Sequence, residues 1–550
     1  MNTLAILLSA FVIAIVGLMF FIWSQRRSLI TGGREAAESI FIPGEIGTIE
    51  EPAATPANQT AMQAAHVLAG KPPTGIDPKE IQERIEADRS SGPVALLMMG
   101  AAVFWLLVAS TFGLISSIKL HEPDWLGGAM WLSFGVTRTL HLNAVAYGWA
   151  PLACLGSTIW MLPRLLKTKL VAGNYAIAGA IIWNIGLVAG LVGIANGYNT
   201  GLEWLEIPAP IASLLVIGGA LIGIPLVATL VNRKTDHLYV SVWYMGAALF
   251  WFPVLLLTAK LPIHHGIQQA TMNWWFGHNV LGLFYTPLSL ASIYYLLPKI
   301  IGRPVESYNL SLVGFWTLAF FYGQVGGHHL IGSPVPNWLI NLSIVQSVMM
   351  IIPVMSFTIN QHLTMSGHFR LMLHSPTLRF VVLGGMMYTL SSLQGSIEAL
   401  RSVNTVTHFT HFTVAHAHLG LYGFVTLVMF GAFYFIMPRI RGWEWPYPRL
   451  IQLHFWLVTL GFGIYFVMLT WAGIAQGLAM LDASRPFIDS VTVTHAGLVG
   501  RTVGGAMMTL GHLVFAGHFI AMLLKSGPKR DTAALLWTGV LPASQDAATN

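Results

Sequence analysis

The chain has few charged residues and a single cysteine, Cys154, among its 550 residues. Charged residues make up 9% of the sequence, whereas soluble domains carry about 25%, which excludes an ordinary soluble protein. One cysteine excludes an internal disulfide, a cysteine-ligated iron–sulfur cluster, a Cys-x-x-Cys-His haem attachment site and a copper site built on paired cysteines. Apolar residues, at 55%, and histidines, of which there are twenty, are abundant instead. Imidazole is a common ligand for haem iron, copper and non-haem iron.

Long apolar segments follow one another along most of the chain and predict an all-α polytopic membrane protein. Each has close to the ~20 residues that a helix needs to cross a bilayer. We expect twelve spans, at 94–117, 131–162, 173–195, 210–231, 238–259, 276–298, 308–331, 338–360, 377–401, 411–437, 450–477 and 499–525. A further apolar run at 1–23 is interpreted as an extra N-terminal transmembrane anchor, because it lacks the basic start and the small-residue cleavage site of a signal peptide.

The remaining segments are polar. Residues 24–93 are predicted to form a cytoplasmic linker that ends in a short helix, and residues 526–550 a disordered tail. Basic residues such as Arg164, Arg233 and Arg439 fall on alternate loops, which the positive-inside rule places in the cytoplasm. The net charge of +6 therefore reflects these loops, and no nucleic-acid partner is expected.

Histidines gather at one depth of this topology, towards the outer side of the membrane. The segment VTHFTHFTVAHAHLGLYG (406–423) holds four, and polar groups inside a bilayer usually mark function. His416 and His418 point about 200° apart on a helix, so each can serve a different planar cofactor. His328 and His329 end a span and can converge on one ion with His278. A lone buried histidine such as His141 is otherwise often a hydrogen-bonded core residue.

The motifs together resemble the haem–copper oxidase superfamily, and within it the catalytic subunit of the cbb3-type (C-type) cytochrome c oxidases. The resemblance covers about 94–525, which it implies to be a twelve-helix catalytic domain. It is carried by WLSFGVTRTLHLNAV (131–145), TDHLYVSVWYMGA (235–247), NWWFGHNVLGLF (273–284), YYLLPKIIGRPVESYNLSLVGFWTLAFFYGQVGGHHL (294–330), SVNTVTHFTHFTVAHAHLGLYG (402–423) and LHFWLVTLGFGIYFVMLTWAGIAQG (453–477).

The resemblance implies a role for each matched residue. His141 and His418 would be the axial ligands of low-spin haem b, and His416 the proximal ligand of high-spin haem b3. Copper B would be bound by His278, His328 and His329. Tyr322 would be the active-site tyrosine, which in this family is covalently joined to the first copper-ligating histidine, here His278, and supplies an electron and a proton during O–O cleavage.

Two departures from the family pattern concern proton delivery. The family usually has a glutamate where this chain has Gln394, and Glu398, one helical turn later, is expected to substitute for it or to approach the metal site. The family often has a histidine where this chain has Gly314. Ser311, Tyr294 and Tyr295 are either members of a proton path from the cytoplasm or interfacial hydroxyls.

Two further positions match the family weakly. Glu206 lies where relatives have an acidic residue near a calcium ion between the haem propionates, and Arg501 matches a propionate partner.

The predicted function is that of a terminal respiratory oxidase in the bacterial inner membrane, which reduces O2 to water with electrons from cytochrome c and translocates protons. Without a c-type haem motif of its own, the chain needs membrane-anchored c-type cytochrome subunits as partners. The main alternative is a nitric oxide reductase, in which non-haem iron replaces copper and takes an added carboxylate. That family lacks the tyrosine, and the 276–298 span here has no carboxylate. A haem-binding sensor or inactive relative is the other alternative.

Overall fold

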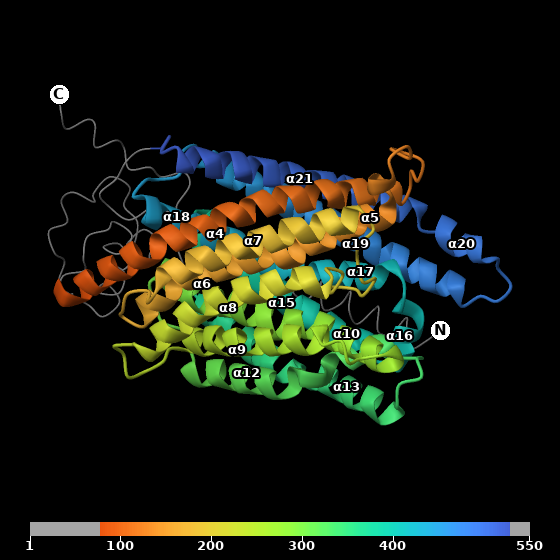
Figure 1. Cartoon of the computed structure of the whole chain (residues 1–550), viewed down its shortest axis with the longest axis horizontal. Helices are drawn as coiled ribbons and strands as arrows, with labels where there is room; N and C mark the ends of the chain where they lie inside the picture. The colour runs from red at the N-terminus through yellow and green to blue at the C-terminus, as the bar shows by residue number, and fades with distance from the viewer. Residues whose placement is uncertain (1–77, 528–550) are drawn as a thin grey trace.

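The computed structural model describes residues 78–527, and every regular element within them is a helix. The helices lie side by side along one axis (Figure 1). In chain order the spans are built from α4 (Pro78–Lys119); α5 (Phe134–Asn143), η2 (Ala144–Trp149) and α6 (Ala150–Leu165); α7 (Gly173–Ala195); α8 (Ala209–Val231); α9 (Val240–Lys260); α10 (Gly266–Val280), η3 (Leu281–Tyr285) and α11 (Thr286–Ile301); α12 (Tyr308–Phe321) and η4 (Tyr322–Leu330); α13 (Asn337–Met349) and α14 (Ile351–Met365); α15 (Pro376–Glu398); α17 (His411–His418), η6 (Leu419–Thr426) and α18 (Leu427–Arg441); α19 (Arg449–Met480); and α20 (Phe487–Thr492) and α21 (His495–Leu523). The short helices η1 (Met130–Leu132), η5 (Phe369–Leu373) and α16 (Arg401–Thr407) lie between spans.

Eleven helical segments of the described chain are long and apolar enough to cross a bilayer. The twelfth expected span, 308–331, is present in a broken form. Its α-helix, α12, is 14 residues long and then tightens into the 3-10 helix η4. The anchor predicted at 1–23, most of the 24–93 linker and the tail beyond 527 lie outside the described residues.

Several predicted boundaries were wrong because apolar length underestimates how far a helix extends. Helix α4 begins at Pro78 and runs through Pro93, so the short helix assigned to the linker is continuous with the first span. Helix α10 begins at Gly266 rather than at 276, which places His278 near the end of that helix and not at its start. Polar residues at these helix ends lower the hydropathy without ending the helix.

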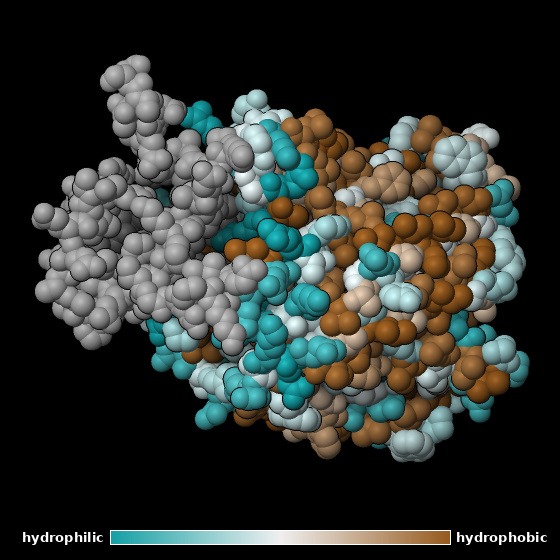
Figure 2. Space-filling model, turned by 60° about the vertical axis from the view of Figure 1, so that its left-hand side comes forward, coloured by the Kyte–Doolittle hydropathy of each residue, from teal (hydrophilic) through white to brown (hydrophobic). Residues whose placement is uncertain are grey.

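Large apolar side chains cover the outside of the bundle, as a lipid-facing surface requires. Figure 2 shows apolar side chains spread widely over one face, with hydrophilic ones gathered towards one end. Phe320 and Ile224, for example, are 76% and 64% exposed. Three spans differ, because 94%, 89% and 83% of their most apolar windows are buried: Phe134–Leu165, Gly266–Ile301 and His411–Arg441. We call these the inner spans.

Candidate metal centre

A cavity of about 390 Å³ lies among the inner spans and their neighbours. The structure brings all the redox residues expected from the sequence to its walls: His141, His278, Tyr322, His328, His329, His416 and His418. Its lining is mostly apolar, with a few convergent polar groups, which is typical of a cofactor site.

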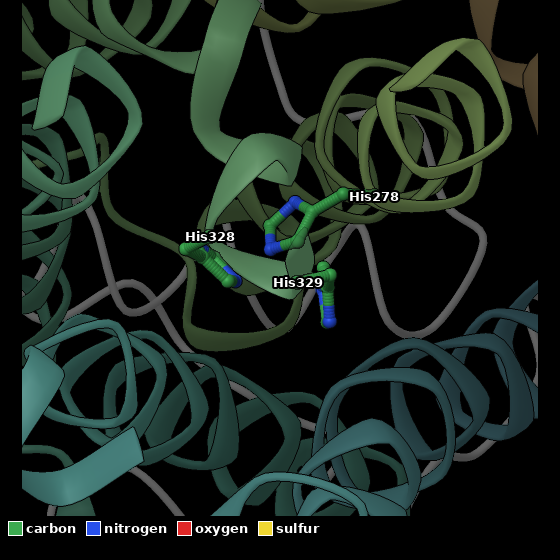
Figure 3. A group of neighbouring side chains, drawn as sticks. All are labelled: His278, His328 and His329. Carbon is green, nitrogen blue, oxygen red and sulfur yellow. The ribbon is translucent and has the colours of Figure 1, made fainter. Parts of the chain in front are cut away.

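Three imidazoles converge on one side of the cavity (Figure 3). His278 comes from α10, and His328 and His329 come from η4; one ring nitrogen from each lies within 4.8 Å of the others. No aspartate, glutamate or cysteine of the described chain joins this group. The three side chains therefore form an all-imidazole metal site.

Hydrogen bonds fix which nitrogen of His328 is free to bind a metal. The Ser347 hydroxyl donates its proton to the Ser343 carbonyl at 2.8 Å, so it can only accept from His328 Nδ1, which lies 2.9 Å away. Nδ1 therefore carries the hydrogen and Nε2 the lone pair, the usual arrangement for a metal-bound imidazole. Sequence reasoning missed Ser347, which lies on α13 and carries no motif that links it to the histidines.

The other two imidazoles are held by packing. The ring of His329 stacks on the Trp274 indole, with centres 4.3 Å apart and planes 16° apart. His278 Nδ1 is buried and has no hydrogen-bond partner. An unpaired buried nitrogen is costly, and a metal ion at this cluster offers a ligand site for that ring.

His141 and His418 face one another across the cavity. Each donates its Nδ1 hydrogen to a backbone carbonyl at 2.8 Å, of Ala109 and Val414 respectively, which leaves both Nε2 lone pairs free. The Tyr465 hydroxyl lies 3.1 Å from His418 Nε2 and can donate to it. The two rings are 6.2 Å apart and within 7° of parallel. Because metal–imidazole bonds are about 2 Å long, this separation fits two axial ligands of one haem iron.

His416 projects from the same helix, α17, and has a different neighbour. Its Nδ1 lies 3.2 Å from Oε1 of Gln394 and donates to it, so Nε2 is left for a ligand. A side chain at Gly395 would lie 3.1 Å from that Nε2 and would crowd it. Glycine at 395 therefore keeps the face of the His416 ring open, which fits an iron ligand.

The backbone changes form immediately after the ligand histidines of every inner span. The π-helical segments η2, η3 and η6 begin within three residues of His141, His278 and His418. A π-helical segment accommodates an extra residue in an α-helix and is frequent at functional sites. Hydropathy carries no signal for it, so sequence reasoning missed all three.

Tyr322 opens η4 and lies beside the three-imidazole cluster. Its ring centre is 5.4 Å from that of His278. On α15, Tyr388 also lines the cavity and is buried; sequence reasoning missed it. Both Tyr388 and Tyr294 pack edge-on against Phe357, at 5.3 Å and 5.7 Å. Buried tyrosines therefore extend from the cavity towards the end of the bundle predicted to be cytoplasmic.

The other predicted proton-path residues are held by structural contacts. The Ser311 hydroxyl is buried and donates to the Tyr308 carbonyl at 2.5 Å. The Tyr295 hydroxyl accepts from Arg164 Nε at 3.1 Å, and Arg164 is also paired with Asp88. Tyr295 is thus tied to an ion pair, whereas Tyr294 packs next to Phe357.

Glu398 does not take the place of Gln394. Its carboxylate accepts from the Thr413 hydroxyl at 2.6 Å, and it is not a member of the metal-ligand group. Gln394 itself makes the contact with His416. A shift of one helical turn along α15 would move the side chain to another depth.

Glu206 and Arg501 lie at the outer end of the site. The Glu206 carboxylate accepts from Asn143 at 3.1 Å, and burial raises its pKa to about 7. Lys260 donates to the carbonyls of Leu205 and Ile207, on either side of Glu206. Because an ammonium group already takes two nearby oxygens, the residues present do not fit calcium, which prefers six to eight oxygen ligands. Arg501 lines the cavity, and its Nε is buried without a partner.

Comparisons with known proteins agree on one family. A family profile described as cytochrome C and quinol oxidase polypeptide I matches residues 93–507. The chain is 33% identical over 431 residues to the cbb3-type cytochrome c oxidase subunit CcoN1 of Stutzerimonas stutzeri, covering 75% of this chain and 91% of that protein. It is 30% identical to a cytochrome c oxidase subunit 1 homolog of Agrobacterium tumefaciens, covering 81% and 86%.

More distant similarities add the fold and the rival reaction. A solved haem–copper terminal oxidase dimer matches with a TM-score of 0.66 at 17% identity, covering 81% of this chain and 86% of that one, which shows the fold alone. A nitric oxide reductase polypeptide of Stutzerimonas stutzeri is 25% identical over 393 residues, covering 66% and 80%.

Proposed function

Because the chain belongs to the cytochrome c and quinol oxidase polypeptide I family, we propose that it is the catalytic subunit of a cbb3-type terminal oxidase, which reduces O2 to water and couples this to proton translocation. The observation that carries the proposal is the all-imidazole cluster of His278, His328 and His329, which shares one cavity with His416 and with Tyr322.

The ligand chemistry of the cluster supports copper over non-haem iron. Imidazole suits both metals, but non-haem iron sites usually add a carboxylate, and no described carboxylate joins the three rings. Glu398 is bonded to Thr413 instead. Copper B at the three imidazoles, high-spin haem b3 at His416 and low-spin haem b between His141 and His418 are the cofactors of the proposal.

The side chains around these positions prepare the reaction. When bound, the haems and copper B deliver electrons and hold O2. Ser347 keeps the Nε2 lone pair of His328 directed at the metal position, and the Trp274 indole fixes the plane of the His329 ring. The Tyr322 phenol, beside His278, donates a proton and an electron.

Protons reach Tyr322 along the buried hydroxyls on the side of the bundle predicted to be cytoplasmic. Tyr388 is at the cavity wall, and Tyr294 is separated from it by Phe357. Ser311 lies buried on the adjacent helix α12. Tyr295 holds Arg164 and is left out of the path.

Electrons come from outside the chain, since it has no cysteine pair for a c-type haem or a dinuclear copper site. We assign this task to membrane-anchored c-type cytochrome subunits, supplied by cytochrome c at the outer side of a bacterial inner membrane. Arg501, at that end of the cavity, is placed to bind a haem propionate.

The test is the metal content of the purified complex, by mass spectrometry, with haem counted separately by its pyridine haemochrome. Copper in an amount equal to the chain, with all the iron in haem, is the expected result. Absence of copper, with iron in excess of haem, would replace the proposal with nitric oxide reduction. Correct metals without O2 turnover would indicate an inactive relative.

A further inference from the structure

The backbone of η3 touches the aromatic ring of Tyr322 at one residue, Gly282. A Cβ atom added at this position would lie 1.7 Å from Cζ, 1.8 Å from Cε1 and 2.3 Å from Cε2 of Tyr322. Carbon atoms in contact are normally about 3.5–4.0 Å apart. Any side chain at 282 would therefore displace the phenol ring by about 2 Å.

The surrounding backbone cannot move aside to accept such a side chain. The Gly323 carbonyl, next to Tyr322, accepts from Trp275 Nε1 and from Asn279 Nδ2, both at 3.0 Å. These two bonds join η4 to α10. A Cβ at Gly326 would lie 2.4 Å from the Trp274 carbonyl, so the two elements already pack backbone to backbone. The ring of Tyr322 is the part that has room to move, because it lines the cavity.

We propose that Gly282 is a positioning residue for Tyr322: the absence of a side chain at 282 lets the phenol lie against the helical turn that follows His278. Gly282 comes one turn after His278, and the Tyr322 ring is 5.4 Å from the His278 ring. A methyl group at 282 pushes the phenol away from His278 and towards the open cavity. This inference rests on the proposed function, in which Tyr322 supplies a proton and an electron.

The three-imidazole cluster is expected to survive the substitution. His328 is held by Ser347 and His329 by Trp274, and neither contact involves Gly282. Misplacing a reacting group by about 1 Å can cost a hundredfold in rate. Gly282→Ala should therefore lower O2 reduction about a hundredfold in a complex that keeps its copper and both haems.

The experiment compares Gly282→Ala with two matched glycine variants in the complete oxidase complex. A Cβ at Gly323, adjacent to Tyr322, would meet nothing within 4 Å, and one at Gly277 would make an ordinary contact of 3.4 Å with Trp204. Gly323→Ala and Gly277→Ala should keep O2 turnover within a few-fold of the wild type. Copper content, haem content and the yield of tyrosyl radical by electron paramagnetic resonance are measured for each.

A double-mutant cycle separates positioning from general damage. If Gly282 acts through the phenol, Gly282→Ala combined with Tyr322→Phe should be no slower than Tyr322→Phe alone. Additive losses would overturn the inference, as would an active Gly282→Ala complex with a normal radical yield.

Failure to assemble is also informative. If Gly282→Ala loses its metals, adding Tyr322→Ala removes the clash and should restore copper and haem, and a double variant that still lacks them contradicts the inference. Failure of the proposed function would appear differently, as a wild-type complex that does not reduce O2.

Discussion

The inner spans and the peripheral spans of this bundle use the same apolar alphabet for different purposes. In the inner spans, 83–94% of the most apolar window is buried, against 33–56% in the eight other continuous spans. Only the inner spans of the described chain contain π-helical segments. His141, His278, His416 and His418 all lie on inner spans.

The difference shows what a cofactor demands of a membrane helix. A peripheral span needs only an apolar exterior and internal backbone hydrogen bonds. An inner span must also direct an imidazole into a cavity at a fixed angle, and a π-helical segment changes the rotation of the residues beyond it. Glycines complete the arrangement, since a Cβ at Gly113 would lie 2.6 Å from His141 Nδ1 and one at Gly395 would lie 2.8 Å from His416 Cε1.

The largest expected effect separates two buried histidines that differ in location. His416 lies on an inner span and His454 on the peripheral span α19, where it is fully buried and bonded through Nδ1 to Tyr434. His416→Ala should remove the high-spin haem and leave the low-spin haem, because His418 points to the opposite side of the helix. The measurement is the haemochrome count with the reduced-minus-oxidised and carbon monoxide difference spectra.

His454→Ala is the matched control for that experiment. It leaves the Tyr434 hydroxyl without its partner and should cost about 1–3 kcal/mol of stability, with both haems retained. Equal haem loss in the two variants would mean that burial, and not location on an inner span, decides cofactor binding.

The next effect concerns the broken span. Tyr322 lies where α12 gives way to η4, and Tyr322→Phe keeps the ring that packs on Gly282 while removing the hydroxyl. O2 reduction should fall at least about a hundredfold, with the spectra of both haems and the copper content unchanged. Normal O2 uptake by the purified variant would remove Tyr322 from the mechanism.

A smaller effect is expected one layer out from a ligand. Gln394→Leu deprives His416 Nδ1 of its acceptor, and loss of such a supporting bond typically costs about 10–100-fold in metal affinity. Retention of the high-spin haem on dilution should fall, and the iron–histidine stretching frequency should shift. Gln346→Leu, which removes a peripheral amide that accepts from the Gln324 backbone, should change neither.

The sequence predicted the helical class, the number of spans and the residues around the cavity, because hydropathy and histidine spacing report on them directly. It did not predict what depends on backbone detail or on distant partners. The extension of α4 to Pro78 and of α10 to Gly266 crosses polar residues that resemble loops. Ser347 and Tyr388 meet the site only through folding, and Glu398 was assigned the contact that Gln394 makes.

The smallest effect lies outside the spans, in the loop that covers an inner one. Burial raises the pKa of Glu206 from 4.5 to about 7, so the folded chain keeps this proton at pH values where the unfolded chain has released it. Stability should then fall as pH rises from about 4.5 to about 7, by on the order of 3 kcal/mol. Glu206→Gln keeps an acceptor for Asn143 and should abolish that fall, seen as an apparent melting temperature that depends less on pH than in the wild type. An identical pH profile for the two proteins would show that the Glu206 carboxylate is compensated by positive charge, and Lys260, which is bonded to the carbonyls on either side of it, would be the residue to replace next.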